Sequence, residues 1–395
     1  MKHIPVSRRG FLQIGSGLAV GAALSSASAR ADGVERPRAV RRPVIDITDL
    51  YHPHQDRGDN FDLIAAYALP EVDLRAVILD VTGRYLRPYI NEADPGYNDP
   101  RGKRAPGFIP VHQLNYIFDL NVPCACAPFE PMRSPGDDMA DAPRFQQGGI
   151  DLLIETLRES NEPVDVVSFG SARPLAVALN REPELLREKV RLAHLCIGGY
   201  PPGYLEWNVQ LDVHAYVRLI RSDLPLALYP CATEESPFAL GTHNCYWTME
   251  TLNWVREMAP PLQRYIEFAF GGSTRMDFLN AMDETEPLTD MTEFYGHKHH
   301  VWETAVWAQV AERRFVAREG EPYRLLPKSS AGFGTSEIEE GLMPCVFEVS
   351  DEGQLTMRAT AGKTTASLYF RPDPIAYEAA AGQALRDLYI GFAAD

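Results

Sequence analysis

Two groups of acidic residues near the start of the chain could together bind a cation. The first group is Asp46 and Asp49, in and just after an apolar, β-branched run, and the second is Asp59, Asn60 and Asp62. Carboxylates that lie close together repel one another unless a proton or a cation relieves them. Ca²⁺ and Mg²⁺ suit such a place, because both bind several oxygen ligands. A competing interpretation is that Asp59 and Asn60 only cap a helix, whose positive end favours acidic groups.

A cluster of histidines late in the chain is a second candidate for chemistry. His297, His299 and His300 lie within four positions, and Glu303 follows them. Because the pKa of histidine is close to neutrality, these residues could donate a proton at physiological pH. Three histidines at this spacing could instead bind a transition metal. They could also occupy the solvated start of a helix and have no function.

The elements that must position these residues alternate between short β-branched runs and stretches with helical periodicity. This pattern predicts an α/β fold, with a mainly parallel open sheet and helices on both faces. In such sheets ligands bind at the carboxyl ends of the strands, and the first acidic group stands at such an end. Strands are predicted at residues 44–48, 74–81, 122–127, 164–169, 191–197 and 226–229. Helices are predicted at residues 59–69, 111–119, 150–160, 174–180, 183–189, 209–221 and 302–314.

Two long loops and a C-terminal extension complete the predicted architecture. Residues 84–107 and 128–145 are predicted to be loops, and loops of this length in a compact domain usually have a function. Residues 345–349 and 355–359 flank a turn that contains Gly353, which predicts a β-hairpin. A strand at residues 367–370 and a helix at residues 374–389 are predicted to follow.

The first 31 residues have the three parts of a secretory signal peptide. A basic start precedes a Gly/Ala-rich apolar run, and Ala29-Arg30-Ala31 offers a cleavage site. Residues 7–13 resemble the twin-arginine export motif, which predicts a periplasmic or extracellular protein. The apolar run is too short for a stable membrane span, and none is expected after cleavage. An uncleaved anchoring tail is the alternative. The predicted divisions are a signal peptide (1–31), a linker (32–42), a main domain (43–318) and an extension packed on it (319–395).

Composition excludes one class of partner and says little about the cysteines. The chain has 54 acidic and 38 basic residues, a formal net charge of −16, and no basic stripe in its body. Such a surface repels phosphodiester backbones, so nucleic acid is not an expected partner. The six cysteines show neither a CxxC pair nor zinc-site spacing, which favours structural thiols.

Five short motifs, in order, resemble the inosine-uridine-type nucleoside hydrolase family. They are the two acidic groups at residues 44–62, the Pro-Glu step at 69–77, the strand, Gly-rich turn and helix at 164–184, the strand with paired glycines at 195–199, and Glu206-Trp207-Asn208-Val209 with Asp212. The similarity covers roughly residues 43–314. It implies a nucleoside-hydrolase-like fold and hydrolysis of the N-glycosidic bond of a small ribosyl- or sugar-containing substrate. Members are commonly oligomeric, which suggests a homo-oligomer.

The resemblance also implies a role for individual residues. A bound Ca²⁺, or alternatively Mg²⁺, would hold sugar hydroxyls and a water, with Asp49 as the base. Either His299 or His300 would protonate the leaving group. The implied metal ligands are Asp46, Asp49, Asp59, Asn60, the backbone carbonyl of Phe169, and Glu303. The implied substrate-binding residues are Asp59, Asp62, Arg84, Glu206, Trp207 and Asn208.

The chain departs from the family pattern at several of these positions. Asn60 stands where the family has a second Asp, the turn at residues 50–58 is enlarged, and Thr82-Gly83-Arg84 replaces an expected Asn. An alternative function is therefore a non-catalytic nucleoside- or sugar-binding protein that retains the fold. A third is a glycan-active or scaffold protein of the outer envelope that uses the C-terminal extension to bind partners.

Overall fold

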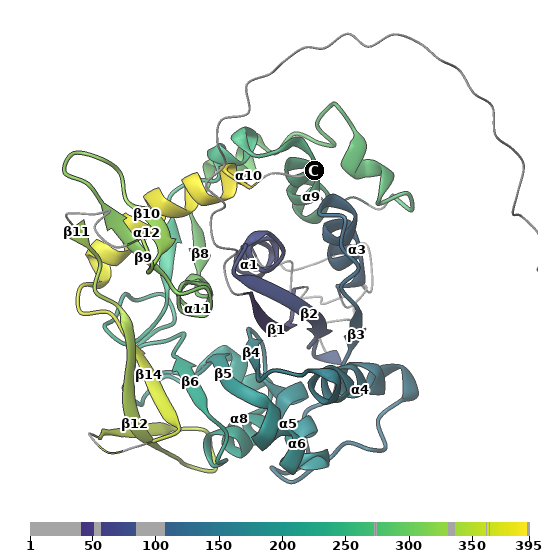
Figure 1. The fold of residues 1–395 in the computed structure, drawn as a ribbon, viewed down its shortest axis with the longest axis vertical. Coiled ribbons are helices and arrows are strands. Elements are labelled where there is room, and N and C mark those ends of the chain that lie inside the picture. Colours follow the sequence, from purple (N-terminus) through teal and green to yellow (C-terminus); the bar gives the residue numbers. More distant parts are fainter. Residues whose placement is uncertain are drawn as a thin grey trace, which may run out of the picture. The chain divides into compact units, whose positions relative to one another are not determined.

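The computed structural model describes residues 41–50, 57–83, 107–271, 273, 275–330, 336–360, 362 and 364–392. They belong to a unit that spans Ala39–Asp395 (Figure 1). The predicted signal peptide at residues 1–31, most of the predicted linker at 32–42, and Arg84 lie outside the described residues.

A nine-stranded, mainly parallel sheet forms the centre of this unit. Its strand order is β13-β12-β14-β6-β5-β4-β1-β2-β3. All neighbours from β14 to β3 are parallel, and β12 is antiparallel to both β13 and β14. The predicted fold class is thereby confirmed. The strands are β1 (Arg42–Thr48), β2 (Val72–Leu79), β3 (Cys124–Cys126), β4 (Val164–Ser168), β5 (Val190–Cys196), β6 (Leu226–Tyr229), β12 (Gly341–Val349), β13 (Leu355–Ala359) and β14 (Ala366–Phe370).

Helices cover both faces of the sheet, and each face has its own hydrophobic core. One core is formed with α1 (Arg57–Ala68), α3 (Phe108–Ile117), α9 (Pro260–Phe270), α11 (Thr304–Val310) and α12 (Pro374–Ile390). The other is formed with α4 (Arg144–Glu159), α5 (Arg173–Arg181), α6 (Pro183–Lys189) and α8 (Val213–Ile220). Burial on both faces explains why the parallel strands are almost continuously apolar in sequence.

Strand β1 places the first acidic group. It lies between β2 and β4, with Ile47 paired to both Ile78 and Ser168. Side chains alternate along a strand, so Asp46 points to the face that carries α1, as Val44 does. Since β1, β2 and β4 run parallel, their carboxyl ends meet at one edge of the sheet.

The C-terminal segment extends the same sheet. The hairpin predicted around Gly353 is confirmed, since β12 and β13 pair antiparallel and Gly353 has a φ of 84°. In the figure, β12 and β14 continue the sheet beyond β6 (Figure 1). Helix α12 packs in the core that also contains α1. There the hydroxyl of Tyr389 donates to the backbone oxygen of Phe61 at 2.9 Å.

Two predicted elements were wrong or incomplete. The helix predicted at residues 302–314 ends at Val310, and Arg313–Ala317 forms β9, which pairs with β10 (Arg324–Pro327) and β11 (Ser336–Glu337). Helical periodicity could not reveal pairing with a strand that comes later in the chain. The histidine stretch holds a short strand, β8 (His299–Val301), paired with β7 (Trp247–Met249).

The remaining elements are short. They are α7 (Trp207–Leu211), α10 (Thr292–Gly296), and the 3₁₀ helices η2 (Asn253–Glu257) and η3 (Asn280–Asp283). The helix predicted at residues 209–221 is divided, because Asp212 ends α7 and its side chain caps α8 by accepting from the backbone N–H of Ala215.

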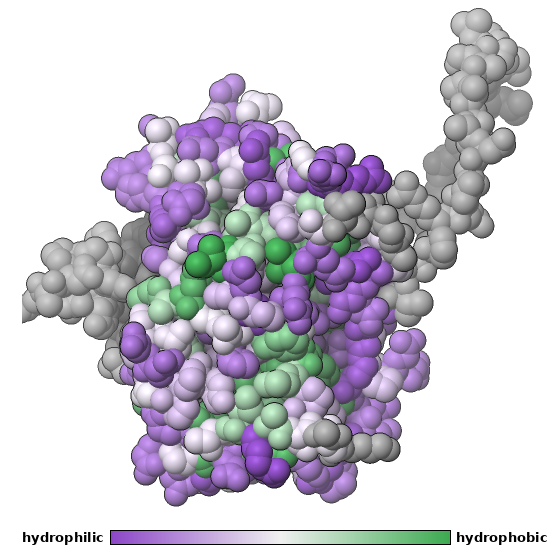
Figure 2. Space-filling view, turned by 90° about the vertical axis from the view of Figure 1, so that its left-hand side faces the viewer, coloured by the Kyte–Doolittle hydropathy of each residue, from purple (hydrophilic) through white to green (hydrophobic). Residues whose placement is uncertain are grey.

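Hydrophobic residues form several patches between hydrophilic ones on the face shown in Figure 2. Single exposed apolar side chains, such as Ile375 on α12, are ordinary on protein surfaces. Within the described residues, no helix combines the length and apolar character needed to cross a bilayer.

Candidate active site

Three buried carboxylates meet at the edge of the sheet where the parallel strands end. Asp59 and Asp62 lie one turn apart on α1, and Glu303 immediately precedes α11. One carboxylate oxygen of each lies within 4.8 Å of the others, and all three residues are buried. Carboxylates this close repel one another, and a cation bound between them would relieve that repulsion. Their hard oxygen donors fit a divalent cation such as Ca²⁺ or Mg²⁺.

A glycine lets Glu303 approach the first turn of α1. A Cβ atom on Gly58 would overlap the carboxylate of Glu303, so a residue with a side chain would displace it. The backbone N–H of Trp302 donates to Oε2 of Glu303 at 2.9 Å. Local backbone contacts therefore hold this carboxylate against α1.

Two further carboxylates border the turn that follows β4. A Cβ atom on Gly170 would lie 2.9 Å from Oδ2 of Asp80 and 3.2 Å from Oδ2 of Asp49. Asp49 follows β1, and Asp80 follows β2. The rule that predicted Asp49, an acidic residue at the carboxyl end of a buried strand, also applies to Asp80, which the sequence analysis missed.

Asp80 belongs to a buried network centred on Arg173. The Arg173 guanidinium contacts Asp212 at 2.8 Å and Asp80 at 3.7 Å, and all three side chains are fully buried. It also donates to the backbone oxygen of Pro128 at 2.7 Å, and the hydroxyl of Ser171 donates to Asp80 at 2.9 Å. Burial raises the pKa of Asp80, while Arg173 and Ser171 act in the opposite direction. The network ties the ends of β2 and β4 to α8.

Asp46 is buried in the middle of β1, outside the group of three carboxylates. Its Oδ1 has no hydrogen-bond partner among the described residues, and neither do the hydroxyls of Thr48 and Ser168. Burial raises the pKa of Asp46 to about 8, because the apolar surroundings disfavour its charge. Asp46 is therefore neutral at pH 7 unless a cation binds beside it.

Asn60 and Phe169 contact neighbouring residues, and their roles as metal ligands stay predictions. The hydroxyl of Tyr265 on α9 donates to Oδ1 of Asn60 at 2.9 Å. Asn60 and Asp59 point in different directions, since consecutive residues are about 100° apart around a helix. The ring of Phe169 packs on Trp307 of α11 at 6.0 Å, and its backbone N–H donates to Ile47 at 2.9 Å.

Glu206, Trp207 and Asn208 lie beside the carboxyl end of β5. The Glu206 carboxylate caps α7, accepting from the backbone N–H groups of Asn208 at 2.9 Å and Gly198 at 2.8 Å. The side-chain amide of Asn208 donates to the backbone oxygen of Cys196 at 3.1 Å. Trp207 is 37% exposed. Burial raises the pKa of Glu206 to about 7, although its backbone donors oppose the rise.

The raised pKa of Glu206 predicts that the fold loses stability with rising pH. Between its unfolded pKa near 4.5 and its folded pKa of about 7, the folded state retains a proton that the unfolded state has lost. The free energy of unfolding should therefore fall by about 2 to 3 kcal/mol from about pH 5 to about pH 8 on account of this group. Urea unfolding of Glu206→Gln across this range should show a flatter curve than the wild type. Parallel curves for the variant and the wild type would contradict the raised pKa of Glu206. The control is Glu155→Gln, on the exposed side of α4.

The two candidate proton donors differ in their surroundings. His299 is buried, and its Nε2 is 3.0 Å from the backbone oxygen of Phe294. Burial, together with the nearby Arg57 guanidinium, lowers the pKa of His299 to about 4, so it is neutral at pH 7. His300 is exposed, and its Nδ1 is 2.7 Å from the hydroxyl of Tyr246. His300 is the more accessible candidate.

An aromatic cluster adjoins the carboxylates through Trp302, the neighbour of Glu303. The ring centroids of Phe238, Tyr246, His300 and Trp302 lie 5.0 to 6.3 Å apart. Phe238 is 58% exposed and forms the outer side of the cluster. Such rings can stack on a planar heterocycle.

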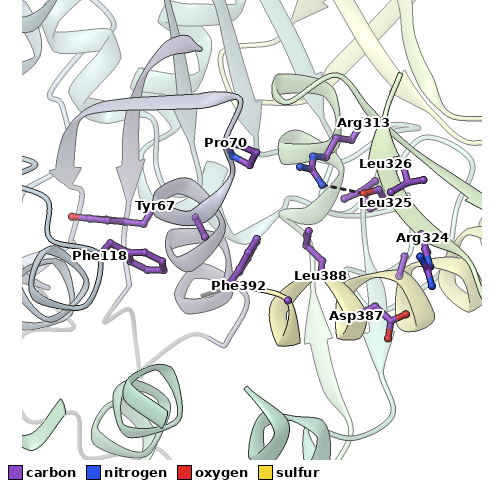
Figure 3. A pocket seen from close by; sticks show the side chains of 13 residues that line it. Tyr67, Pro70, Phe118, Arg313, Arg324, Leu325, Leu326, Asp387, Leu388 and Phe392 are labelled. Atoms are coloured by element: carbon purple, nitrogen blue, oxygen red, sulfur yellow. Dashed lines mark hydrogen bonds between the residues drawn. The ribbon is translucent and has the colours of Figure 1, made fainter. Parts of the chain in front are cut away.

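A separate cavity lies at the other end of α1. It has a volume of about 670 Å³ and is lined by Tyr67, Pro70, Arg313, Leu388, Phe392 and their neighbours (Figure 3). On one side of it, the Arg313 guanidinium donates to the backbone oxygen of Leu325 at 3.1 Å. None of the predicted site residues that the structure describes lines this cavity, and we assign it no part in the chemistry.

Comparison with known proteins gives short sequence matches and distant structural ones. No family model matches the chain. It is 32% identical over 83 residues to the pyrimidine-specific ribonucleoside hydrolase RihA of Enterobacter sp. (strain 638), covering 20% of this chain and 26% of that protein. The corresponding protein of Salmonella typhimurium is 31% identical over 138 residues, covering 30% of this chain and 44% of that protein. The chain thus matches less than half the length of these relatives.

Solved structures of ribonucleoside hydrolases align with more of the chain. The purine-preferring ribonucleoside hydrolase from Gardnerella vaginalis is 14% identical, with a TM-score of 0.48, covering 88% of this chain and 99% of that one.

Proposed function

We propose that this protein is an exported, metal-dependent hydrolase of N-glycosidic bonds in nucleoside-type substrates. The observation that carries the proposal is the convergence of Asp59, Asp62 and Glu303 at the carboxyl edge of a parallel sheet. The local sequence similarity to ribonucleoside hydrolases supports the substrate class. The proposed export rests on residues 1–31, and mass spectrometry of the mature N-terminus recovered outside the cytoplasm would test it.

The three carboxylates are the proposed metal ligands, and Asp49, which follows β1, stays the proposed base. A hard divalent cation, Ca²⁺ by preference, would bind hydroxyl and water oxygens there and favour loss of a proton from water. Asn60 lies outside this group of three carboxylates, and its side-chain oxygen accepts from Tyr265. Asp62, one turn along α1, supplies the second carboxylate instead.

The remaining roles fall to the chain's own residues. Cleavage of an N-glycosidic bond builds positive charge on the sugar, and the buried carboxylates stabilise that charge. Asp49 accepts the proton of the attacking water, and the exposed His300 gives a proton to the departing base. Glu206, Trp207 and Asn208, beside the end of β5, orient the sugar. The cluster of Phe238, Tyr246, His300 and Trp302 stacks on the base.

Replacing Phe238 by Ala should weaken binding of the base without altering the chemical step. Removing one stacked ring costs about 1 kcal/mol, so KM should rise roughly fivefold while kcat stays near the wild-type value. Initial rates over a range of nucleoside concentrations measure both constants. Ile375→Ala, at another exposed apolar position, is the matched control. A fall in kcat with unchanged KM would contradict the stacking role.

A product assay tests the proposed function. The purified mature protein would be incubated with Ca²⁺ and a panel of purine and pyrimidine nucleosides, and free base and free ribose would be measured separately. Release of both in equal amounts supports hydrolysis. Calorimetric binding of a nucleoside or sugar without release of either product would instead favour the non-catalytic binding protein.

A further inference from the structure

Three cysteines that are far apart in the sequence meet in the interior. Cys196 ends β5, Cys231 follows β6, and Cys245 precedes β7. The sulfur of Cys196 lies 3.6 Å from that of Cys231 and 3.6 Å from that of Cys245. All three sulfurs lie within 4.8 Å of one another, and the residues are buried. We name them the thiol cluster.

The immediate surroundings of the thiol cluster are polar on one side. The sulfur of Cys245 is 3.3 Å from the backbone oxygen of Pro230, and that of Cys196 is 3.8 Å from the backbone oxygen of Trp302. The buried Arg371 guanidinium donates to Oδ1 of Asn244 at 3.0 Å and to the backbone oxygen of Tyr246, on either side of Cys245. A positive charge therefore stands beside Cys245, whereas burial raises the pKa of the Cys196 and Cys231 thiols.

We propose that the thiol cluster binds one thiophilic d¹⁰ cation, Cu(I) or Zn(II), through its three sulfurs. Metal–sulfur bonds of about 2.3 Å place sulfurs around one ion roughly 3.8 to 4.0 Å apart. The observed separations of 3.6 Å need only a small expansion to reach that spacing. Soft thiolate ligands select these cations over Ca²⁺ and Mg²⁺. Each coordinating thiol releases its proton to solvent when the ion binds.

The thiol cluster is chemically distinct from the carboxylate site and lies beside it. The backbone oxygen of Cys196 accepts from Asn208, and that of Cys231 accepts from the indole N–H of Trp302 at 2.9 Å. A bound ion would thus fasten together the ends of β5 and β6, which hold two residues of the proposed substrate site. The three cysteines lack a local sequence motif, because the fold alone brings them together.

Metal binding by the full-length mature chain tests the proposal. The reduced, chelator-treated protein would be titrated with Zn(II), and separately with Cu(I) against a competing Cu(I) chelator, in excess Ca²⁺ to occupy the carboxylate site. One equivalent of either ion should bind, and X-ray absorption should show three sulfur ligands at about 2.3 Å. Whichever of the two ions binds more tightly is the cation of this site.

Two cysteine variants and one control separate this site from general thiol reactivity. Cys196→Ala and Cys245→Ala should each lower the affinity at least about a hundredfold, because two sulfurs remain. Cys345→Ala, at a buried thiol elsewhere, should bind as the wild type does. Thermal unfolding identifies any variant that fails to fold. If one of the two cysteine variants fails, the metal affinity of the other tests the proposal. Binding below a tenth of an equivalent, oxygen or nitrogen ligands only, or a disulfide within the cluster in the isolated protein would overturn the proposal.

Discussion

Replacing Glu303 by Gln should reduce kcat/KM for nucleoside hydrolysis by about 10³-fold. The substitution keeps the size of the side chain and an oxygen that can accept from Trp302, but removes one of the three negative charges. A bound cation contributes several kcal/mol to the transition state of such reactions, and each 1.4 kcal/mol is a factor of ten in rate. Loss of the charge should weaken cation binding, so most of that contribution disappears at limited Ca²⁺.

Initial rates at several Ca²⁺ concentrations, together with thermal unfolding, measure this effect. Ca²⁺ should raise the Tm of the wild type, because it binds the folded state, and should raise that of Glu303→Gln much less. Glu155→Gln, on α4 at the opposite face of the sheet, changes the net charge equally and should behave as the wild type. Wild-type activity and an unchanged Ca²⁺ response in Glu303→Gln would eliminate the carboxylate site.

The sequence predicted the sheet well because its parallel strands are buried on both faces. Such strands appear as almost continuous apolar runs, and β1, β4, β5 and β6 all lie within a residue or two of their predicted bounds. Strand β9 was missed, since nothing within Arg313–Ala317 distinguishes it from the end of a helix. Its pairing with β10 is a tertiary contact, and propensity alone does not reveal it.

The sequence predicted which segments form the candidate site, but it did not predict which acidic residues of those segments meet. Asp59 and Glu303 were expected to share a cation, and their carboxylates do meet. Asp62 was expected to bind substrate, whereas the structure places it with these two. Because the turn before α1 is enlarged, the alignment of the acidic residues on α1 with the family motif is ambiguous. Only the helix geometry shows that Asp62, one turn from Asp59, faces Glu303. The thiol cluster could not be predicted, because its members come from separate elements.

Arg173→Met should destabilise the fold by about 3 to 5 kcal/mol. The substitution fills much of the same volume but leaves Asp80 and Asp212 as buried carboxylates without their counter-ion, which is the costly way to break a buried ion pair. Urea unfolding followed by circular dichroism measures the loss. Arg187→Met, which removes a solvent-exposed arginine that also contacts two carboxylates, should unfold at nearly the wild-type urea concentration.

A double variant separates lost charge compensation from lost packing. If uncompensated charge causes the loss, Arg173→Met combined with Asp80→Asn should be more stable than Arg173→Met alone, because one buried carboxylate is removed with its partner. If the double variant is less stable than the single one, uncompensated charge on Asp80 is not the cause of the loss. In the first case Arg173 sets the position of Asp80 by charge. Because Asp80 and Asp49 border the same glycine, Arg173→Met should then also disturb the proposed catalytic base, although Arg173 itself touches no substrate.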